Sequence, residues 1–175
     1  MAKPGQAEQQ FRDLVEQFRA LGAPDPESWA RSQIDEGIPQ YSRFVFLQAA
    51  WKSVIADGDT AWMDQRIQRA EAAPDAPGAG AGLALTRLLA AGASREDLSE
   101  LVRVMQWELL TSLLYQLDDP GAVEYPSNKL PRVGWALVEL DDNDEPKHVI
   151  DSLHESVLET DPAGREMRPK VRPTG

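Results

Sequence analysis

The chain has 175 residues, with 29 acidic and 18 basic side chains, a net charge of −11 and no cysteine. The lack of cysteine excludes disulfides, thiolate metal sites, iron–sulfur clusters and cysteine nucleophiles, so the fold depends on apolar packing. The negative charge repels phosphate backbones, which argues against a nucleic-acid-binding protein and favours basic partners.

The first 39 residues contain signals for two helices. Apolar residues recur at helical spacing between Phe11 and Leu21, which predicts an amphipathic surface helix that ends at Gly22. Asp25 and Pro26 then predict an N-cap and a first-turn proline for a short helix that ends near Gly37.

The segment from Tyr41 to Asp57 has apolar residues around most of a helical circumference. A helix with this pattern is usually central in a fold. A further helix carries Trp62, Met63, Ile67 and Ala70 and stops at Pro74.

Residues 73–82 read Ala-Pro-Asp-Ala-Pro-Gly-Ala-Gly-Ala-Gly. Proline and glycine together disfavour both helix and strand, so we expect a flexible linker here. Each side of it has too few strongly apolar helices to close a core alone. We therefore expect residues 1–162 to form a single helical domain in which the two sides pack together.

The longest helix of the chain follows a short one over Leu83 to Ala91. Ser94 to Asp97 resembles a capping box and starts the long helix, which runs to about Leu117. One apolar stripe follows its length, so we expect a second central helix, packed on the Tyr41–Asp57 helix. The stripe consists of Leu98, Leu101, Val102, Met105, Leu109, Leu113 and Leu117.

The C-terminal third changes character. Prolines at 120, 126 and 131 predict a long loop, and residues 133–150 have the composition of a β-hairpin with a turn at 141–146. A last helical piece over 152–159 precedes a basic tail at 163–175. The predicted fold is therefore mainly α, a compact domain of about six helices with a small C-terminal β-hairpin.

The hairpin turn and the proline-rich loop form the predicted partner-binding surface. Five tryptophans are expected mainly to fill the core, and Trp135 is the one expected to anchor an interface. The residues predicted to bind a partner are Asp141, Asp142, Asp144, Glu145, Trp135 and Tyr125.

Four potential metal ligands lie within one short stretch, namely His148, Asp151, His154 and Glu155. Paired histidine ligands on one helix need a spacing of four residues, whereas these two are six apart. A metal site is geometrically feasible if His148 ends a strand and His154 lies on a helix. The favoured interpretation is that both are surface or capping histidines, with no metal and no cofactor.

Acidic residues recur every four positions at Asp151, Glu155 and Glu159. On a helix they would form one column of like charge, which is unfavourable unless a cation answers it. One hypothesis is that Arg165 or Arg168 of the tail folds back onto this column. The alternative is a solvated face beside a frayed tail.

Glu108 lies where the long helix is apolar on several sides, so it is expected to be partly buried. Together with Tyr115 and tryptophans it could line a small-molecule pocket between the two central helices.

The N-terminus lacks the apolar core of a secretion signal, and no uncharged run is long enough to span a membrane. We therefore expect a cytoplasmic protein. The segments Leu153–Pro169, Trp51–Ile55 and Met105–Leu109 resemble those of a group of bacterial proteins without an assigned function. The resemblance implies a bacterial cytoplasmic protein and carries no catalytic residues.

The sequence favours an acidic interaction protein over an enzyme. It would recognise another macromolecule, a basic protein being the partner that its charge suits, as a bacterial antitoxin or immunity protein does. No nucleic acid or membrane partner is expected, and a homo-oligomer is left open. The alternatives are a metal-dependent hydrolase using the His148/His154 region and a small-molecule-binding helical domain.

Overall fold

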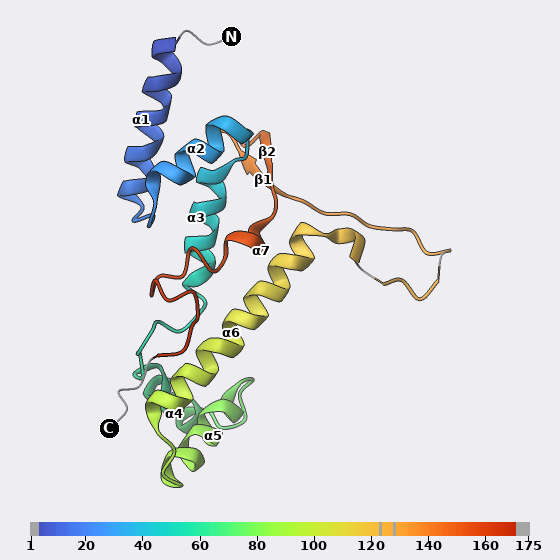
Figure 1. The fold of residues 1–175 in the computed structure, drawn as a ribbon. Helices are drawn as coiled ribbons and strands as arrows, with labels where there is room; N and C mark the ends of the chain where they lie inside the picture. Colours follow the sequence, from blue (N-terminus) through green and yellow to red (C-terminus); the bar gives the residue numbers. More distant parts are fainter. Residues whose placement is uncertain (1–3, 123, 128, 171–175) are drawn as a thin grey trace. The chain divides into compact units, whose positions relative to one another are not determined.

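The computed structural model describes residues 4–122, 124–127 and 129–170. The fold is mainly helical with one two-stranded antiparallel sheet near the C-terminus, as predicted (Figure 1). Part of the predicted basic tail, including Arg172, lies outside the described residues. The elements are α1 (Pro4–Ala20), α2 (Pro26–Glu36), α3 (Gln40–Trp51), α4 (Trp62–Ala72), α5 (Ala79–Ala90), α6 (Arg95–Asp118), the 3₁₀ turn η1 (Pro120–Ala122), β1 (Leu137–Leu140), β2 (Pro146–Ile150) and α7 (Leu153–Ser156).

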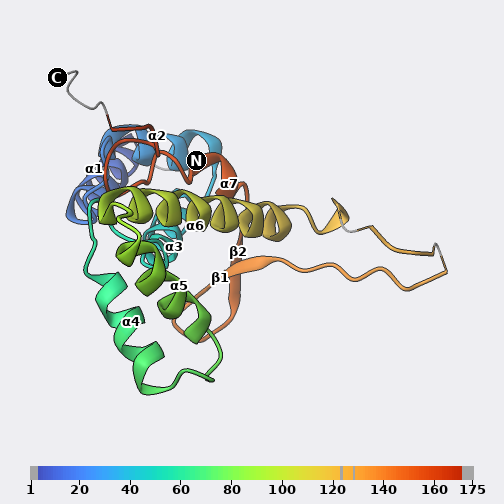
Figure 2. The same ribbon diagram turned by 90° about the horizontal axis from the view of Figure 1, so that it is seen from below.

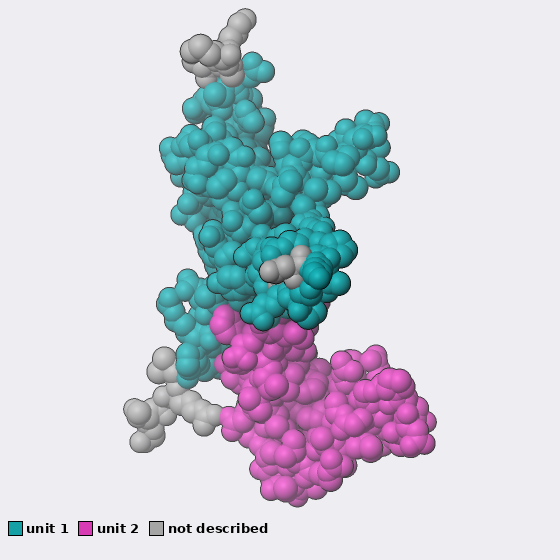
Figure 3. Space-filling view, turned by 90° about the vertical axis from the view of Figure 1, so that its right-hand side faces the viewer, with its two compact units in different colours: residues 1–51, 110–175 teal, residues 52–109 magenta. Residues whose placement is uncertain are grey.

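The chain divides into two compact units, shown in teal and magenta in Figure 3. Unit 1 combines residues 1–51 with residues 110–175, and unit 2 comprises residues 52–109. Helix α6 contributes to both units, since Leu109 is the last residue of unit 2. The prediction that residues 1–162 form a single domain stays a prediction.

The second helix of unit 1, α2, begins and ends at residues whose local chemistry can be recognised in the sequence. The Asp25 side chain accepts a hydrogen bond from the Ser28 backbone N–H at 3.1 Å, which caps α2, and Pro26 occupies its first turn. Gly37 follows α2 with φ 73°, a left-handed conformation that glycine adopts without steric cost. Both predicted boundaries are confirmed.

The core of unit 1 is built by the apolar faces of α1, α2 and α3. Phe18, Trp29 and Phe44 meet at its centre, with the Trp29 and Phe44 ring centroids 5.1 Å apart in an edge-to-face arrangement. Phe18 lies 5.8 Å from Phe44 and 5.9 Å from Trp29. Such aromatic pairs add about 0.5–1.5 kcal/mol each beyond the apolar area that they bury.

Helix α3 is central to unit 1, although it ends at Trp51 and not at the predicted Asp57. The buried Trp51 donates from Nε1 to the Val157 carbonyl and to Thr160 Oγ1, both at 3.1 Å. Leu153 and Val157 are fully buried as well. The C-terminal segment is thereby fixed in unit 1, even though α7 spans four residues in place of the predicted 152–159.

Helices α4 and α5 pack closely within unit 2. The predicted linker at 73–82 overlaps α5, because its last four residues, Ala79 to Gly82, form the first turn of that helix. Gly82 lies where α5 approaches α4 closely: a Cβ at this position would lie 2.3 Å from the Arg66 carbonyl oxygen of α4. This glycine serves close helix packing, which a composition-based interpretation reads as chain flexibility.

The N-terminal part of α6 turns a polar face toward its own unit. The helix starts at the predicted cap, with Ser94 Oγ accepting from the Asp97 backbone N–H at 3.1 Å. Further along, Ser99 Oγ accepts from Trp62 Nε1 at 3.0 Å, and Arg103 and Gln106 bond to the Ile55 carbonyl and N–H at 2.6 and 2.8 Å. These side chains satisfy the backbone groups of Ile55, in the segment before α4, and the indole N–H of Trp62, the first residue of α4.

The apolar stripe of α6 is consequently not buried as predicted. Leu101, Met105 and Leu109 lie outside this polar face of the helix and are 56%, 59% and 62% exposed. Leu113, at the next position of the same spacing, is also exposed. Glu108 is exposed too, so the expected partial burial of this residue is wrong. Because the inward positions are taken by polar groups, the apolar ones must point away from them.

Candidate interaction surface

The hairpin has an inner face that is held by α3. In the antiparallel pair, Leu137 lies opposite Ile150 and Glu139 opposite His148. Ile150 is buried, and the Glu139 carboxylate accepts a hydrogen bond from Ser42 Oγ of α3 at 2.7 Å. Since paired residues share a face of a sheet, this face is the one directed at α3.

Glu139 is the polar centre of that inner face. Burial is the largest single influence on its pKa and raises it, but hydrogen bonds from Lys147 at 2.7 Å and from Ser42 together outweigh burial, so the pKa lies below its usual value. The carboxylate therefore stays ionised and ties β1 both to β2 and to α3.

The outer face of the hairpin is apolar and exposed. Val138 and Val149 form a directly opposed pair, and Leu140 follows on the same side. Their exposed fractions are 37%, 54% and 49%. The usual pattern of a half-buried antiparallel strand, apolar inside and polar outside, is reversed here between Val138 and Glu139. A reversal of this kind marks a face that is suited to being covered.

The acidic turn between the strands is internally braced. The Asp141 carboxylate accepts from the backbone N–H groups of Asn143 at 2.8 Å and of Glu145 at 3.0 Å. The bonds from the Glu145 and Asn143 amides lower the pKa of Asp141. Asp142, Asp144 and Glu145 are exposed around it. The turn thus presents several carboxylates beside the apolar outer face.

The loop between α6 and β1 projects away from both elements in Figures 1 and 2. Its two arms are joined where Tyr125 Oη accepts from the Val133 backbone N–H at 2.9 Å. Trp135 is exposed, and its Nε1 donates to the Gln116 carbonyl of α6 at 2.7 Å. The two aromatic residues of the predicted partner surface therefore also brace this loop, which exposes Leu130 and Val133 as well.

The four candidate metal ligands are not brought together. His148 is exposed on β2, whereas His154 of α7 is hydrogen-bonded to Asp118, Nδ1 to Oδ2 at 2.6 Å, and stacks on the Tyr115 ring with the ring centroids 3.9 Å apart. Asp151 and Glu155 are exposed. Within residues 4–122, 124–127 and 129–170, no three His, Asp or Glu side chains are grouped so that they could hold a metal ion.

A buried arginine of α3 anchors the C-terminal segment, a role that we did not predict from the sequence. Arg43 Nη2 donates to the Ser152 carbonyl at 2.5 Å and to Ser156 Oγ at 3.0 Å. Burial lowers the pKa of Arg43, while nearby carboxylates, Glu155 foremost, oppose that change. The only sequence signal is a single base inside the apolar run of α3.

Arg43 is also the cation that faces the predicted acidic column. Its charge interacts with Asp151, Glu155 and Glu159, while Arg168 of the tail pairs with its neighbour Glu166, Nη2 to Oε2 at 2.6 Å. The column itself is wrong as a helical feature, because α7 is too short to include Asp151 or Glu159.

Glu159 is exposed, and the loss of solvation around its carboxylate is the largest cause that raises its pKa. Asp25 and Glu166 raise it further, and Arg43 offsets these effects only in part.

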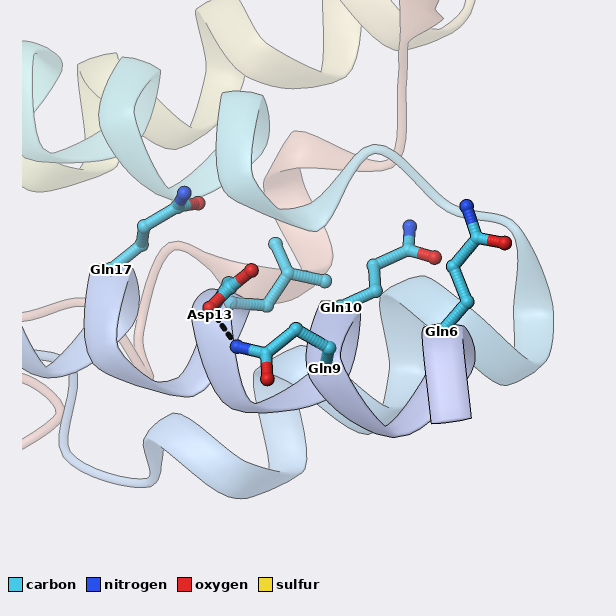
Figure 4. A pocket seen from close by; sticks show the side chains of 6 residues that line it. Gln6, Gln9, Gln10, Asp13 and Gln17 are labelled. Carbon is cyan, nitrogen blue, oxygen red and sulfur yellow. Dashed lines mark hydrogen bonds between the residues drawn. The ribbon is translucent and has the colours of Figure 1, made fainter. Parts of the chain in front are cut away.

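A hollow of about 450 Å³ lies along α1. Gln6, Gln9, Gln10, Asp13 and Gln17 fan out over it in Figure 4, and Gln9 donates to the Asp13 carboxylate at 2.8 Å. Every lining residue belongs to this one helix, so no second element closes the hollow around a ligand. Glu108 and Tyr115, expected to line a small-molecule pocket, are both exposed.

A search for membrane-spanning helices and comparisons with known proteins both gave negative results. No described helix has the length and apolar character that a membrane span requires. No protein-family model matches the chain, and no curated protein or solved structure gives a significant match.

Proposed function

We propose that this protein is a binding module that recognises a basic segment of another protein through the outer face of its C-terminal hairpin. The observation that carries the proposal is the apolar, exposed outer face formed by Val138, Leu140 and Val149. A two-stranded hairpin is marginally stable by itself. An apolar outer face adds nothing to its stability unless a partner covers it.

The acidic turn favours a partner whose binding segment is positively charged. Asp142, Asp144 and Glu145 are exposed beside the apolar face, and the whole chain carries a net charge of −11. Opposite charge on the partner would accelerate association and select against acidic competitors. A bacterial antitoxin or immunity protein that covers a basic toxin is one concrete form of this function.

The exposed area of the apolar face limits how much it can contribute to the free energy of binding. The three side chains still expose between 37% and 54% of their area. Complete burial of such a side chain contributes about 1.5–3 kcal/mol, so covering what remains exposed contributes roughly 3 kcal/mol in total. That alone gives weak binding, and backbone hydrogen bonds along a strand edge together with the turn carboxylates would supply the rest.

Site-specific photo-crosslinking in the native cell tests the proposal. A benzophenone amino acid replaces Val149 in one form of the protein and Gln68, an exposed residue of α4, in the control form. We expect a discrete product at position 149 that is missing at position 68, with the crosslinked peptide lying in a basic segment of the partner.

The matched variant is Val138→Thr, which keeps a β-branched side chain of similar shape but removes the apolar surface. We expect it to fold normally by circular dichroism and to lose the product at position 149. Identical products at both positions, or a product that survives Val138→Thr, would show that the outer face is not a binding surface.

A further inference from the structure

A second exposed apolar surface lies on α6 and does not depend on the hairpin. Leu101, Met105 and Leu109 follow each other at intervals of four residues and are each more than half exposed. We name them the α6 row. Side chains at this spacing form one of the ridges with which a helix packs into the groove of another helix. The row therefore has the form of a helix-packing surface.

The polar face of the helix shows that the row is not a core stripe that is merely poorly covered. Ser99 is hydrogen-bonded to Trp62 at the start of α4, and Arg103 and Gln106 are hydrogen-bonded to Ile55 in the segment before α4. Ser99 and Arg103 are both buried. Rotating α6 to bury the row would break these bonds and leave buried polar groups unpaired, which is costly.

The charges around the row select the kind of partner. Both bases of residues 95–109 are directed to their own unit: Arg95 pairs with Asp64, Nη2 to Oδ1 at 2.5 Å, and Arg103 bonds to the Ile55 carbonyl. Asp97, which precedes Leu101 by four residues, and Glu108 are exposed beside the row. If a second copy of this protein packed against the row, acidic side chains would face acidic side chains, which is unfavourable. A helix with lysine or arginine beside its apolar ridge would instead place opposite charges next to these acids.

We infer that the α6 row is a docking site for an amphipathic helix of another protein, one whose apolar ridge is flanked by lysine or arginine. The row supplies the apolar contact, and the acids next to it set the charge preference of the site. This mode of recognition is a helix laid along a complementary apolar face.

The test uses two synthetic helical peptides of about 20 residues, long enough to form helix in solution. They share one leucine ridge and differ only in flanking residues, which are lysine in one peptide and glutamate in the other. Binding to the full-length protein is followed by fluorescence anisotropy at physiological salt. We expect the lysine peptide to bind at least about tenfold more tightly than the glutamate peptide.

The variant Met105→Gln/Leu109→Gln keeps good helix formers while it removes apolar surface. It should weaken binding of the lysine peptide by at least about tenfold. The control Val45→Gln replaces an apolar residue of α3 that is 41% exposed, and it should leave binding unchanged. Equal binding of the lysine peptide to both variants would mean that net charge alone attracts it and would overturn the inference.

Two further measurements exclude other occupants of the row. If sedimentation shows a dimer of the wild type that Met105→Gln/Leu109→Gln abolishes, a second copy covers the row and the inference is wrong. If the double variant unfolds several degrees below the wild type, the row is buried by the protein itself and the inference is equally wrong. Because the hairpin is unchanged in this variant, crosslinking at Val149 reports the proposed function separately.

Discussion

Replacing Gly82 by alanine tests how closely α4 and α5 pack. The new Cβ would lie 2.3 Å from the Arg66 carbonyl oxygen and 2.6 Å from Ala70 Cβ. Normal contact distances are about 3.5–4.0 Å, so the helices must separate by roughly 1 Å or more. The nearest obstacle is backbone, which no side-chain rotation can relieve. An overpacking cost of about 3 kcal/mol, less about 1 kcal/mol of improved helix propensity, leaves a net loss of about 2 kcal/mol.

Gly80→Ala is the matched control, because Gly80 lies in the same helix and an added Cβ there has no heavy atom within 4 Å. It should stabilise the protein by about 0.5–1 kcal/mol through helix propensity alone. Urea unfolding followed by far-ultraviolet circular dichroism measures both changes. If Gly82→Ala proves as stable as Gly80→Ala, the close approach of α4 and α5 is wrong.

Three further changes test unit 1. Trp51→Phe removes both indole hydrogen bonds to the C-terminal segment and should lower the free energy of unfolding by about 1–3 kcal/mol in urea titrations, because buried acceptors lose their donor. The lowered pKa of Glu139 stabilises the fold above its usual value of about 4.5, and this contribution is lost as the pH falls through the folded-state pKa. Glu139→Gln should therefore flatten the acid side of a thermal-midpoint profile, and an unchanged slope would contradict the assignment. The pKa of Glu159 is raised, so its ionisation opposes folding as the pH rises above about 4.5. Glu159→Gln should melt higher than wild type at neutral pH but not in acid, and a gain that is independent of pH would refute the poorer solvation of the ionised carboxylate as its cause.

The candidate surface could be predicted from the sequence only in part. The acidic turn at 141–146 and the aromatic residues Tyr125 and Trp135 were identified from composition. The reversed faces of the hairpin were not, because which side of β1 lies against α3 depends on the bond between Ser42 and Glu139, residues 97 positions apart. Alternation in a strand shows that two faces differ, but it does not show which of them a distant helix covers.

The class of fold and the helix boundaries that are set by local chemistry could be predicted from the amino-acid sequence alone. Asp25 and Ser94 cap their helices and Gly37 ends one, because capping side chains and left-handed glycines act within a few residues of the chain. The packing role of Gly82 and the outward direction of the Leu101–Leu109 stripe depend on contacts with distant residues and could not be predicted in this way. Whether a side chain is buried depends on which neighbour its face of the helix meets. On α6, Arg103 and Gln106 bond to the backbone of Ile55, so polar side chains occupy the inner face.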